Sequence, residues 1–68
     1  MKQKFTYYCP ENTELSNNSI WYLTFDEACD TLEDAREANK KHKQKHNSEN
    51  INYRIVKVTE TREVIKND

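Results

Sequence analysis

The order of hydrophobic and polar positions predicts two strands in the first third of the chain. Residues 4 to 9 and 20 to 23 are mostly aromatic or β-branched, a composition typical of strands. Pro10 should end the first strand, because its ring nitrogen has no hydrogen to donate to a neighbour. The segment between the strands contains no Gly, so a turn is expected near Asn17 and Asn18, since Asn tolerates positive φ.

A single long helix is predicted from about Phe25 to about Lys45. Thr24 and Glu27 have the spacing of a capping box, which satisfies free amides at a helix start. Apolar residues recur at intervals of three and four along the first half, so the helix should have one narrow apolar face. Its members are Phe25, Ala28, Cys29, Leu32 and Ala35.

The last part of the chain, residues 51 to 65, is rich in β-forming residues. It forms either one long strand or two strands that turn near residues 59 to 62. No Gly, Pro, Asn or Asp marks that turn, but one strand would exceed the usual length, so we favour a hairpin or a strong bulge. Residues 1 to 68 then form a single α+β domain of order β-β-α-β(-β). One long helix packs on one face of a small, mostly antiparallel sheet of three to four strands.

Both faces of every predicted strand carry apolar or aromatic side chains at alternate positions. One helix covers one face of a sheet, so the other face should be a surface for a partner protein or a second copy. The side chains expected on this surface are Tyr8, Trp21, Val56 and Val58. The alternative is that the chain covers the surface itself, either with Leu15 or with Val64 and Ile65.

Composition restricts the classes of function. The chain has 68 residues and 8.2 kDa, which allows one small core. It has no Gly, so glycine-rich phosphate loops and dinucleotide-binding motifs are excluded. A one-helix domain has little room for paired catalytic carboxylates, and Cys29 has no basic neighbour on the helix to activate it. We therefore expect neither an enzyme nor a cofactor.

The chain has one concentration of basic residues, at the end of the predicted helix. It consists of Lys40, Lys41, Lys43 and Lys45. Acidic residues fill the first half of the helix, so the arrangement complements the helix dipole, and we favour this explanation. The alternative is a contact patch for nucleic acid or an acidic protein, with Tyr8 or Trp21 as stacking surfaces. The net charge of -1 argues against general nucleic-acid binding.

Two pairs of residues could carry metal or redox chemistry. His42 and His46 lie four positions apart and would share a helix face, but the neighbouring lysines repel a cation and spacing places no third ligand. We therefore expect no metal. Cys9 and Cys29 are too far apart for a C-x-x-C motif. They are expected to be reduced and buried, with a disulfide between strand and helix as the alternative.

The hydrophobic runs are short, and none is long enough for a signal peptide or a membrane span. We therefore expect a cytoplasmic protein with no membrane partner.

The run from Asp34 to Asn39 and the run from Tyr53 to Ile65 resemble small uncharacterised proteins of phages and prophages of Gram-positive bacteria. The shared pattern is a helix followed by R-I/V-V-K-V-T-x-T-R-x-V, and it covers about the C-terminal half of the chain. The resemblance implies a phage or prophage origin, expression in the cytoplasm of the host, and no known enzymatic activity. It assigns no functional residue. With the surplus apolar surface, it leads us to expect an accessory protein that binds proteins, as a modulator or inhibitor of a host factor and as a possible homodimer.

Overall fold

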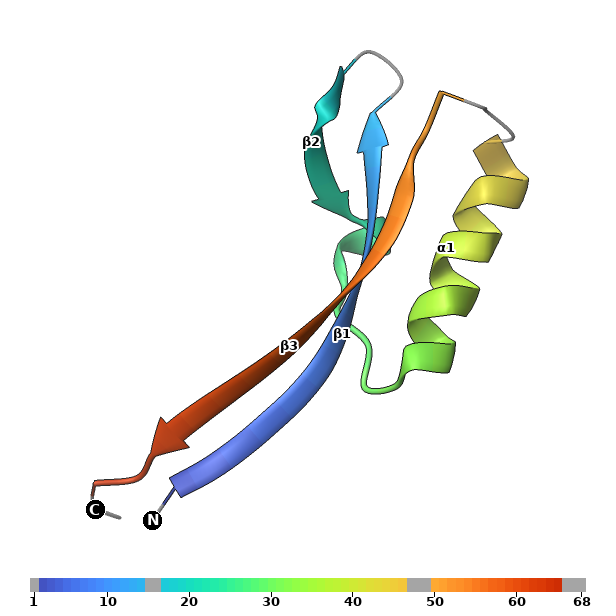
Figure 1. The fold of residues 1–68 in the computed structure, drawn as a ribbon. Helices are drawn as coiled ribbons and strands as arrows, with labels where there is room; N and C mark the ends of the chain where they lie inside the picture. Colours follow the sequence, from blue (N-terminus) through green and yellow to red (C-terminus); the bar gives the residue numbers. More distant parts are fainter. Residues whose placement is uncertain (1, 15–16, 47–49, 66–68) are drawn as a thin grey trace.

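The computed structural model describes residues 2–14, 17–46 and 50–65. Its elements in chain order are strand β1 (Lys2–Glu14), strand β2 (Asn17–Leu23), the short 3-10 helix η1 (Thr24–Asp26), helix α1 (Leu32–His46) and strand β3 (Tyr53–Glu63). The strands form one antiparallel sheet in the order β2-β1-β3 (Figure 1). The predicted α+β class is confirmed, with three strands and one α-helix among the described residues.

The β1–β3 pair is the longest feature of the molecule. It runs without a break from Lys2 opposite Glu63 to Asn12 opposite Tyr53. The hairpin expected near residues 59 to 62 is therefore wrong. Since β1 supplies a backbone neighbour along this whole length, a segment without turn residues remains extended.

Pro10 lies inside β1, so the expectation that it ends the first strand is wrong. The Thr13 amide donates to the Asn52 carbonyl on the β3 side. Tyr8 instead exchanges two backbone hydrogen bonds with Cys29 on the opposite edge. Because backbone groups of alternate residues point to opposite edges of a strand, Pro10 directs its missing N–H toward the Cys29 edge. The proline therefore leaves the β1–β3 hydrogen bonds intact.

The β1–β2 pair is much shorter. Glu11 lies opposite Leu23, and the register shifts after Thr13, so that Glu14 lies opposite Asn17. Asn17 and Asn18 thus belong to β2 and not to a turn. The connection between the strands, residues 15–16, lies outside the described residues.

Helix α1 begins seven residues later than predicted, at Leu32. Thr31 caps it, because its Oγ1 accepts a hydrogen bond from the Asp34 amide (3.1 Å). The predicted cap at Thr24 is wrong. Phe25 and Asp26 have φ angles of 60° and 56°, in the left-handed region, which ends η1 after one turn. The remaining residues before α1 bring Cys29 to the edge of β1.

The left-handed backbone at Asp26 predicts a stabilising substitution. We expect Asp26→Gly to raise the free energy of unfolding by about 0.5–1 kcal/mol, because glycine has no Cβ and adopts positive φ without strain. Asp30→Gly is the matched control, since it removes the same charge at a position without positive φ and should give no gain. Urea unfolding followed by the fluorescence of the single Trp measures both. Equal effects of the two substitutions would contradict the strain argument.

The charges of α1 agree with the dipole explanation. Glu33 and Asp34 lie in its first turn, and Lys43, Lys45 and His46 lie in its last turn. Acidic side chains at the positive end and basic side chains at the negative end stabilise a helix.

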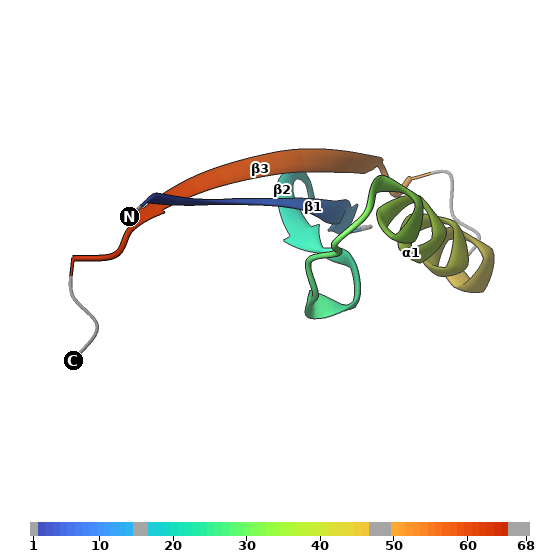
Figure 2. The same cartoon turned by 90° about the horizontal axis from the view of Figure 1, so that it is seen from below.

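The buried interior is small and largely polar. Among the described residues its members are Pro10, Thr13, Thr24, Ala35 and Asn39. The Thr24 hydroxyl donates to Asn39 Oδ1 (2.8 Å), and Asn39 Nδ2 donates to the Arg54 carbonyl (3.0 Å). These bonds join η1, α1 and β3 at one end of the sheet, and the far half of the β1–β3 pair extends beyond the helix (Figures 1 and 2).

Candidate protein-binding face

The register divides the side chains of the sheet into two sets, because directly opposed residues of an antiparallel pair point to the same face. Pro10 lies opposite Ile55 and Asn12 opposite Tyr53, so these side chains share one face, which we call the helix-side face. The other set, which we call the open face, consists of Gln3, Phe5, Tyr7, Cys9, Glu11, Thr13, Trp21, Leu23, Arg54, Val56, Val58, Glu60 and Arg62.

The elements outside the sheet contact the helix-side face. His42 Nδ1 of α1 lies 2.7 Å from the Tyr53 hydroxyl, and the centroids of the two rings are 5.6 Å apart. The Thr24 Oγ1 of η1 lies 2.9 Å from Asn12 Oδ1. Figure 2 agrees, since η1 and α1 lie on the same side of the ribbon. Among the described elements, η1 and α1 therefore lie on the helix-side face, and Thr13 is the one fully buried residue of the open face.

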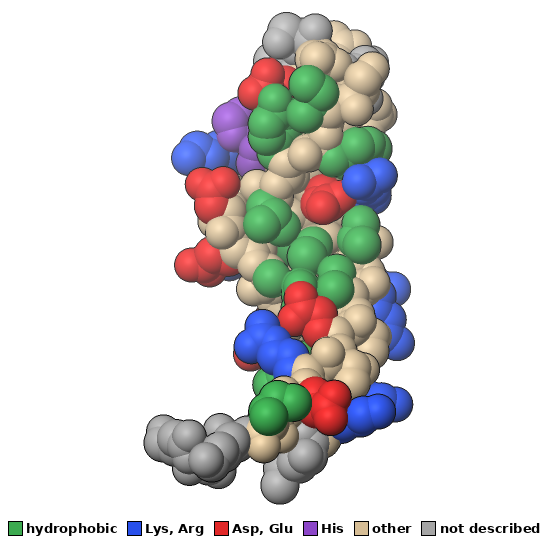
Figure 3. All heavy atoms as spheres, turned by 90° about the vertical axis from the view of Figure 1, so that its left-hand side faces the viewer, with side chains coloured by type: hydrophobic (Ala, Val, Ile, Leu, Met, Phe, Trp, Pro, Cys, Tyr) green, Lys and Arg blue, Asp and Glu red, His purple; other side chains and the backbone are tan. Residues whose placement is uncertain are grey.

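The middle of the open face is apolar. Cys9 lies opposite Val56, and Tyr7 lies opposite Val58, so four side chains form a block across β1 and β3. All four are half-buried. Phe5 extends the apolar surface toward the far end and is 41% exposed. Figure 3 shows hydrophobic side chains that follow the length of the molecule, with charged side chains between them.

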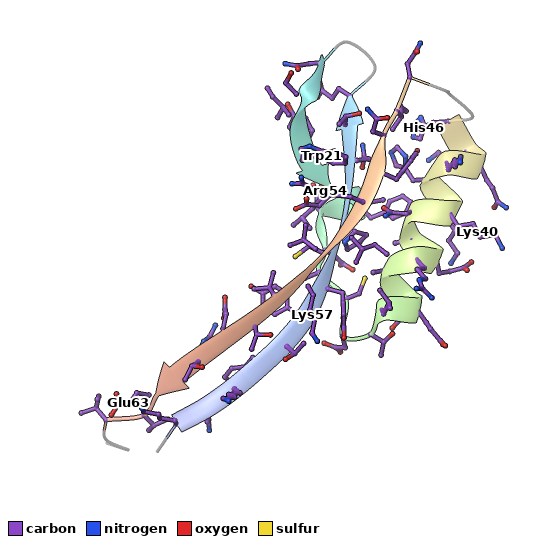
Figure 4. The ribbon with its side chains drawn as sticks, viewed as in Figure 1. Trp21, Lys40, His46, Arg54, Lys57 and Glu63 are labelled. Carbon is purple, nitrogen blue, oxygen red and sulfur yellow. The ribbon has the colours of Figure 1, made fainter. Side chains whose placement is uncertain are left out.

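An arginine, a glutamate and an aromatic ring lie at each end of this block. At the β2 end, Arg54 Nε lies 2.6 Å from Glu11 Oε1, and the Arg54 guanidinium lies 4.1 Å from the centre of the Trp21 ring (Figure 4). At the far end, Arg62 lies 3.3 Å from Glu60 Oε2 and 5.1 Å from the centre of the Phe5 ring. Exposed ion pairs stabilise a fold little. Trp, Tyr and Arg are, however, the residues that most often dominate protein–protein contacts.

A hydrogen bond connects the apolar block to the far cluster. The Tyr7 hydroxyl donates to Glu60 Oε1 (2.8 Å). This bond, followed by burial, raises the pKa of Tyr7 above its ordinary value, so the phenol remains a neutral donor at physiological pH.

The structure brings together three of the four residues predicted for the partner surface. Trp21, Val56 and Val58 share the open face. Tyr8 lies opposite Lys57, on the helix-side face, so the structure separates it from the other three. Alternation alone places Tyr7 and Tyr8 on opposite faces but does not show which face pairs with Val58, because that depends on the register between β1 and β3.

The sequence reasoning missed Phe5, Tyr7 and both arginines as members of this face. The signal that could have found them is the alternation from Phe5 to Cys9 aligned with the alternation from Arg54 to Arg62. Aligning them requires the register, which is fixed by tertiary pairing.

The two segments expected as alternative covers have different outcomes. Ile65 is 84% exposed, so it covers no part of the sheet, whereas Val64 of the same segment is half-buried. Leu15 lies outside the described residues.

The four lysines of the basic block are all exposed on α1, and Lys40 points away from the sheet (Figure 4). The stacking residues proposed with them lie elsewhere. Trp21 belongs to the open face, where the Arg54 guanidinium lies over its ring. Tyr8 pairs with Cys29 through backbone hydrogen bonds. The structure therefore does not combine lysines and aromatic rings into one nucleic-acid surface.

His42 and His46 lie together, with ring centroids 4.1 Å apart. Among residues 2–14, 17–46 and 50–65, no three His, Cys, Asp or Glu side chains are grouped to hold a metal ion. His42 also contacts the ring of Phe25, with centroids 5.8 Å apart. The pair thus forms part of an aromatic cluster between α1, η1 and β3.

We expect folding stability to decrease below neutral pH because of His42. Burial, followed by the charges of His46 and Lys45, lowers the pKa of His42. In the unfolded chain His42 takes up a proton at a pKa of about 6.5. In the folded protein it takes up the proton only at a lower pH. The contribution of neutral His42 to folding stability is therefore fully present above the pKa of the unfolded chain. It is lost as the pH falls through the lower pKa of the folded protein.

Urea unfolding at a series of pH values between about 7.5 and 5.5, above the range in which carboxylates titrate, measures this loss. The control is His42→Gln, which retains a polar neighbour for Tyr53 but cannot titrate. The variant should lose less stability than the wild type over this range. The same pH dependence in both proteins would exclude His42 as its source.

Both cysteines are free thiols. Burial raises the pKa of Cys9 and of Cys29 above the ordinary value. Little thiolate is then present at neutral pH, and neither residue has the character of a catalytic nucleophile.

No protein-family model, curated protein or solved structure matches the chain. None of the helices among the described residues has both the length and the apolar character needed to cross a membrane.

Proposed function

We propose that the protein functions by binding another protein through the open face. The observation that carries this proposal is an apolar block of Tyr7, Cys9, Val56 and Val58, bounded at both ends by arginine–glutamate–aromatic clusters. An apolar centre with a polar rim is the arrangement of a protein–protein contact.

The exposed area supports the proposal. The chain exposes 5589 Å², whereas a compact protein of its mass exposes about 4,500 Å². Its radius of gyration is 15.2 Å, compared with about 11 Å for a compact chain of this length. The excess, about 1,000 Å², is close to the roughly 800 Å² that each partner buries in a standard interface.

The far half of the β1–β3 pair supports it as well. β1 pairs with β2 from Glu11 onward and with Cys29 at Tyr8, so among the described residues only β3 pairs with residues 2 to 7. A two-stranded ribbon without packing on a face is marginal in water. A partner on the open face would supply the missing layer.

The test is affinity capture of a tagged chain, co-expressed with an untagged copy in a Gram-positive bacterium. Val56→Lys/Val58→Lys places two charges on the open face. Thr59→Lys/Thr61→Lys is the matched control, since it places the same charges on the same strand at exposed positions of the helix-side face.

Wild type and control should retain a bound protein, foreign or a second copy, that the open-face variant loses. Circular dichroism establishes that all three proteins are folded. If the folded open-face variant retains every bound protein, the open face is not the binding surface.

We also propose that the protein is a phage-type accessory protein of the bacterial cytoplasm, where it modulates or inhibits a host factor. This part is supported by the resemblance of its C-terminal half alone. Nucleic-acid binding by the exposed lysines of α1 is the alternative. It predicts an electrophoretic shift of DNA or RNA at low salt that disappears as the salt concentration rises.

A further inference from the structure

We propose that the occupant of the open face is a second copy of this chain, packed face to face across a two-fold axis that passes through the apolar block. This inference depends on the proposed function, since it takes the open face as a protein-binding surface. It adds the identity of the partner and the residues that meet at the axis.

The first argument is area. A homodimer must bury a comparable surface on each copy, and stable interfaces remove about 800 Å² from each partner. The chain as a whole exposes 5589 Å², about 1,000 Å² more than a compact monomer of its mass, so an area of this size is available for burial. A sheet that packs on its own copy also becomes a two-layer structure, which is how sheets with two apolar faces are normally covered.

The second argument is charge. An interface across a two-fold axis brings the same patch against itself, so the patch must be complementary to itself. The open face has an arginine and a glutamate at each end, Arg54 with Glu11 and Arg62 with Glu60. Each end therefore carries one positive and one negative side chain. Whichever ends meet, each arginine can face a glutamate of the second copy. The chain as a whole has a net charge of only -1, so two copies repel each other weakly.

The third argument is the position of the apolar block. The Cys9–Val56 and Tyr7–Val58 pairs occupy the middle of the face, with the two charged clusters at similar distances on either side. An axis through this middle brings Cys9 near Cys9 of the second copy, since facing sheets pack about 10 Å apart. Cys29 pairs with Tyr8, a residue of the helix-side face, and would lie away from the axis.

The first experiment locates the axis by cross-linking. A Cys29→Ser variant retains Cys9 as its single thiol and is treated with a short bismaleimide at mildly alkaline pH, where more of the thiol is ionised. We expect a covalent dimer on a denaturing gel. A Cys9→Ser variant, which retains Cys29, is the control: it should still form a dimer in analytical ultracentrifugation but give no covalent dimer on the same gel.

The second experiment measures the oligomeric state of the purified protein over a concentration series by analytical ultracentrifugation. We expect a dimer whose dissociation constant rises at least about thirtyfold in Val58→Lys, as for a central interface residue. Thr59→Lys, the adjacent exposed position on the helix-side face, should leave it within about threefold of the wild type.

A purified wild type that remains monomeric at every concentration overturns the dimer. If its open face still captures another protein in cells, the proposed function remains and the partner is foreign. A dimer that Cys9 does not cross-link, or that Val58→Lys leaves intact, overturns the face-to-face arrangement and assigns the contact to another surface. If Val58→Lys does not fold, the cross-linking pair still decides.

Discussion

Replacing Asn39 with Asp is expected to reduce the free energy of unfolding by about 3 kcal/mol at neutral pH, since a buried charge without a compensating partner costs about 3–5 kcal/mol. Asn39 is almost fully buried, and its Nδ2 donates to the Arg54 carbonyl. A carboxylate has no proton to donate there, so two oxygens would face each other at close range. The Thr24 hydroxyl would still donate to the new side chain, which limits the loss.

The loss would remove most of the stability of a domain this small, whose single core rarely supplies more than about 3–5 kcal/mol. Asn52→Asp is the control, because it makes the same chemical change at an exposed position and should have an effect within about 0.5 kcal/mol. Urea unfolding of the wild type and both variants, followed by Trp21 fluorescence, measures the difference. If both substitutions have the same small effect, Asn39 does not join α1 to β3 in solution.

Replacing Ala35 with Leu is the second substitution with a large expected effect, a loss of about 1–3 kcal/mol. Ala35 is 0% exposed, so a larger side chain must displace the elements packed around it. Leu and Ala both favour helices, so the change tests packing rather than helix formation.

Ala38→Leu is the matched control for Ala35→Leu, since Ala38 lies on the same helix and is only half-buried. We expect Ala38→Leu to leave the unfolding midpoint in urea almost unchanged. A stabilised Ala35→Leu protein would show that the space between α1 and the sheet is larger than the structure indicates.

The two predictions concern the same feature of the fold. One end of the sheet is held by Ala35 and by the hydrogen bonds of Asn39 with Thr24 and the Arg54 carbonyl. The open face lies on the opposite side of the strands from these contacts. Among the described residues, α1 and η1 support the sheet from behind at the β2 end, so a partner layer on the open face would stabilise the far end as well.

Local patterns were sufficient for the element types and insufficient for several boundaries. The helix dipole pattern correctly predicted acids at the start of α1 and lysines at its end. The sequence predicts Thr24 as the helix cap, but Phe25 and Asp26 adopt positive φ and the helix is capped by Thr31 instead. Phe and Asp normally avoid positive φ, so the residue types at these two positions give no sign of it in the sequence.

The strand boundaries failed for a related reason. Pro10 and the segment around residues 59 to 62 were interpreted from their own residue types, but each is kept extended by pairing with a distant strand. The membership of the candidate site depended on the same pairing. Trp21, Val56 and Val58 share the open face, whereas Tyr8 belongs to the other face and Tyr7 takes its place.

By itself, the sequence determined the α+β composition, the order of strands and helix, and a surplus of apolar side chains over what one helix can cover. These follow from residue type and period, which are local properties. Only the tertiary structure decided the register of β1 against β3, and with it which side chains share the open face, because a shift of one residue would exchange the two faces of a strand.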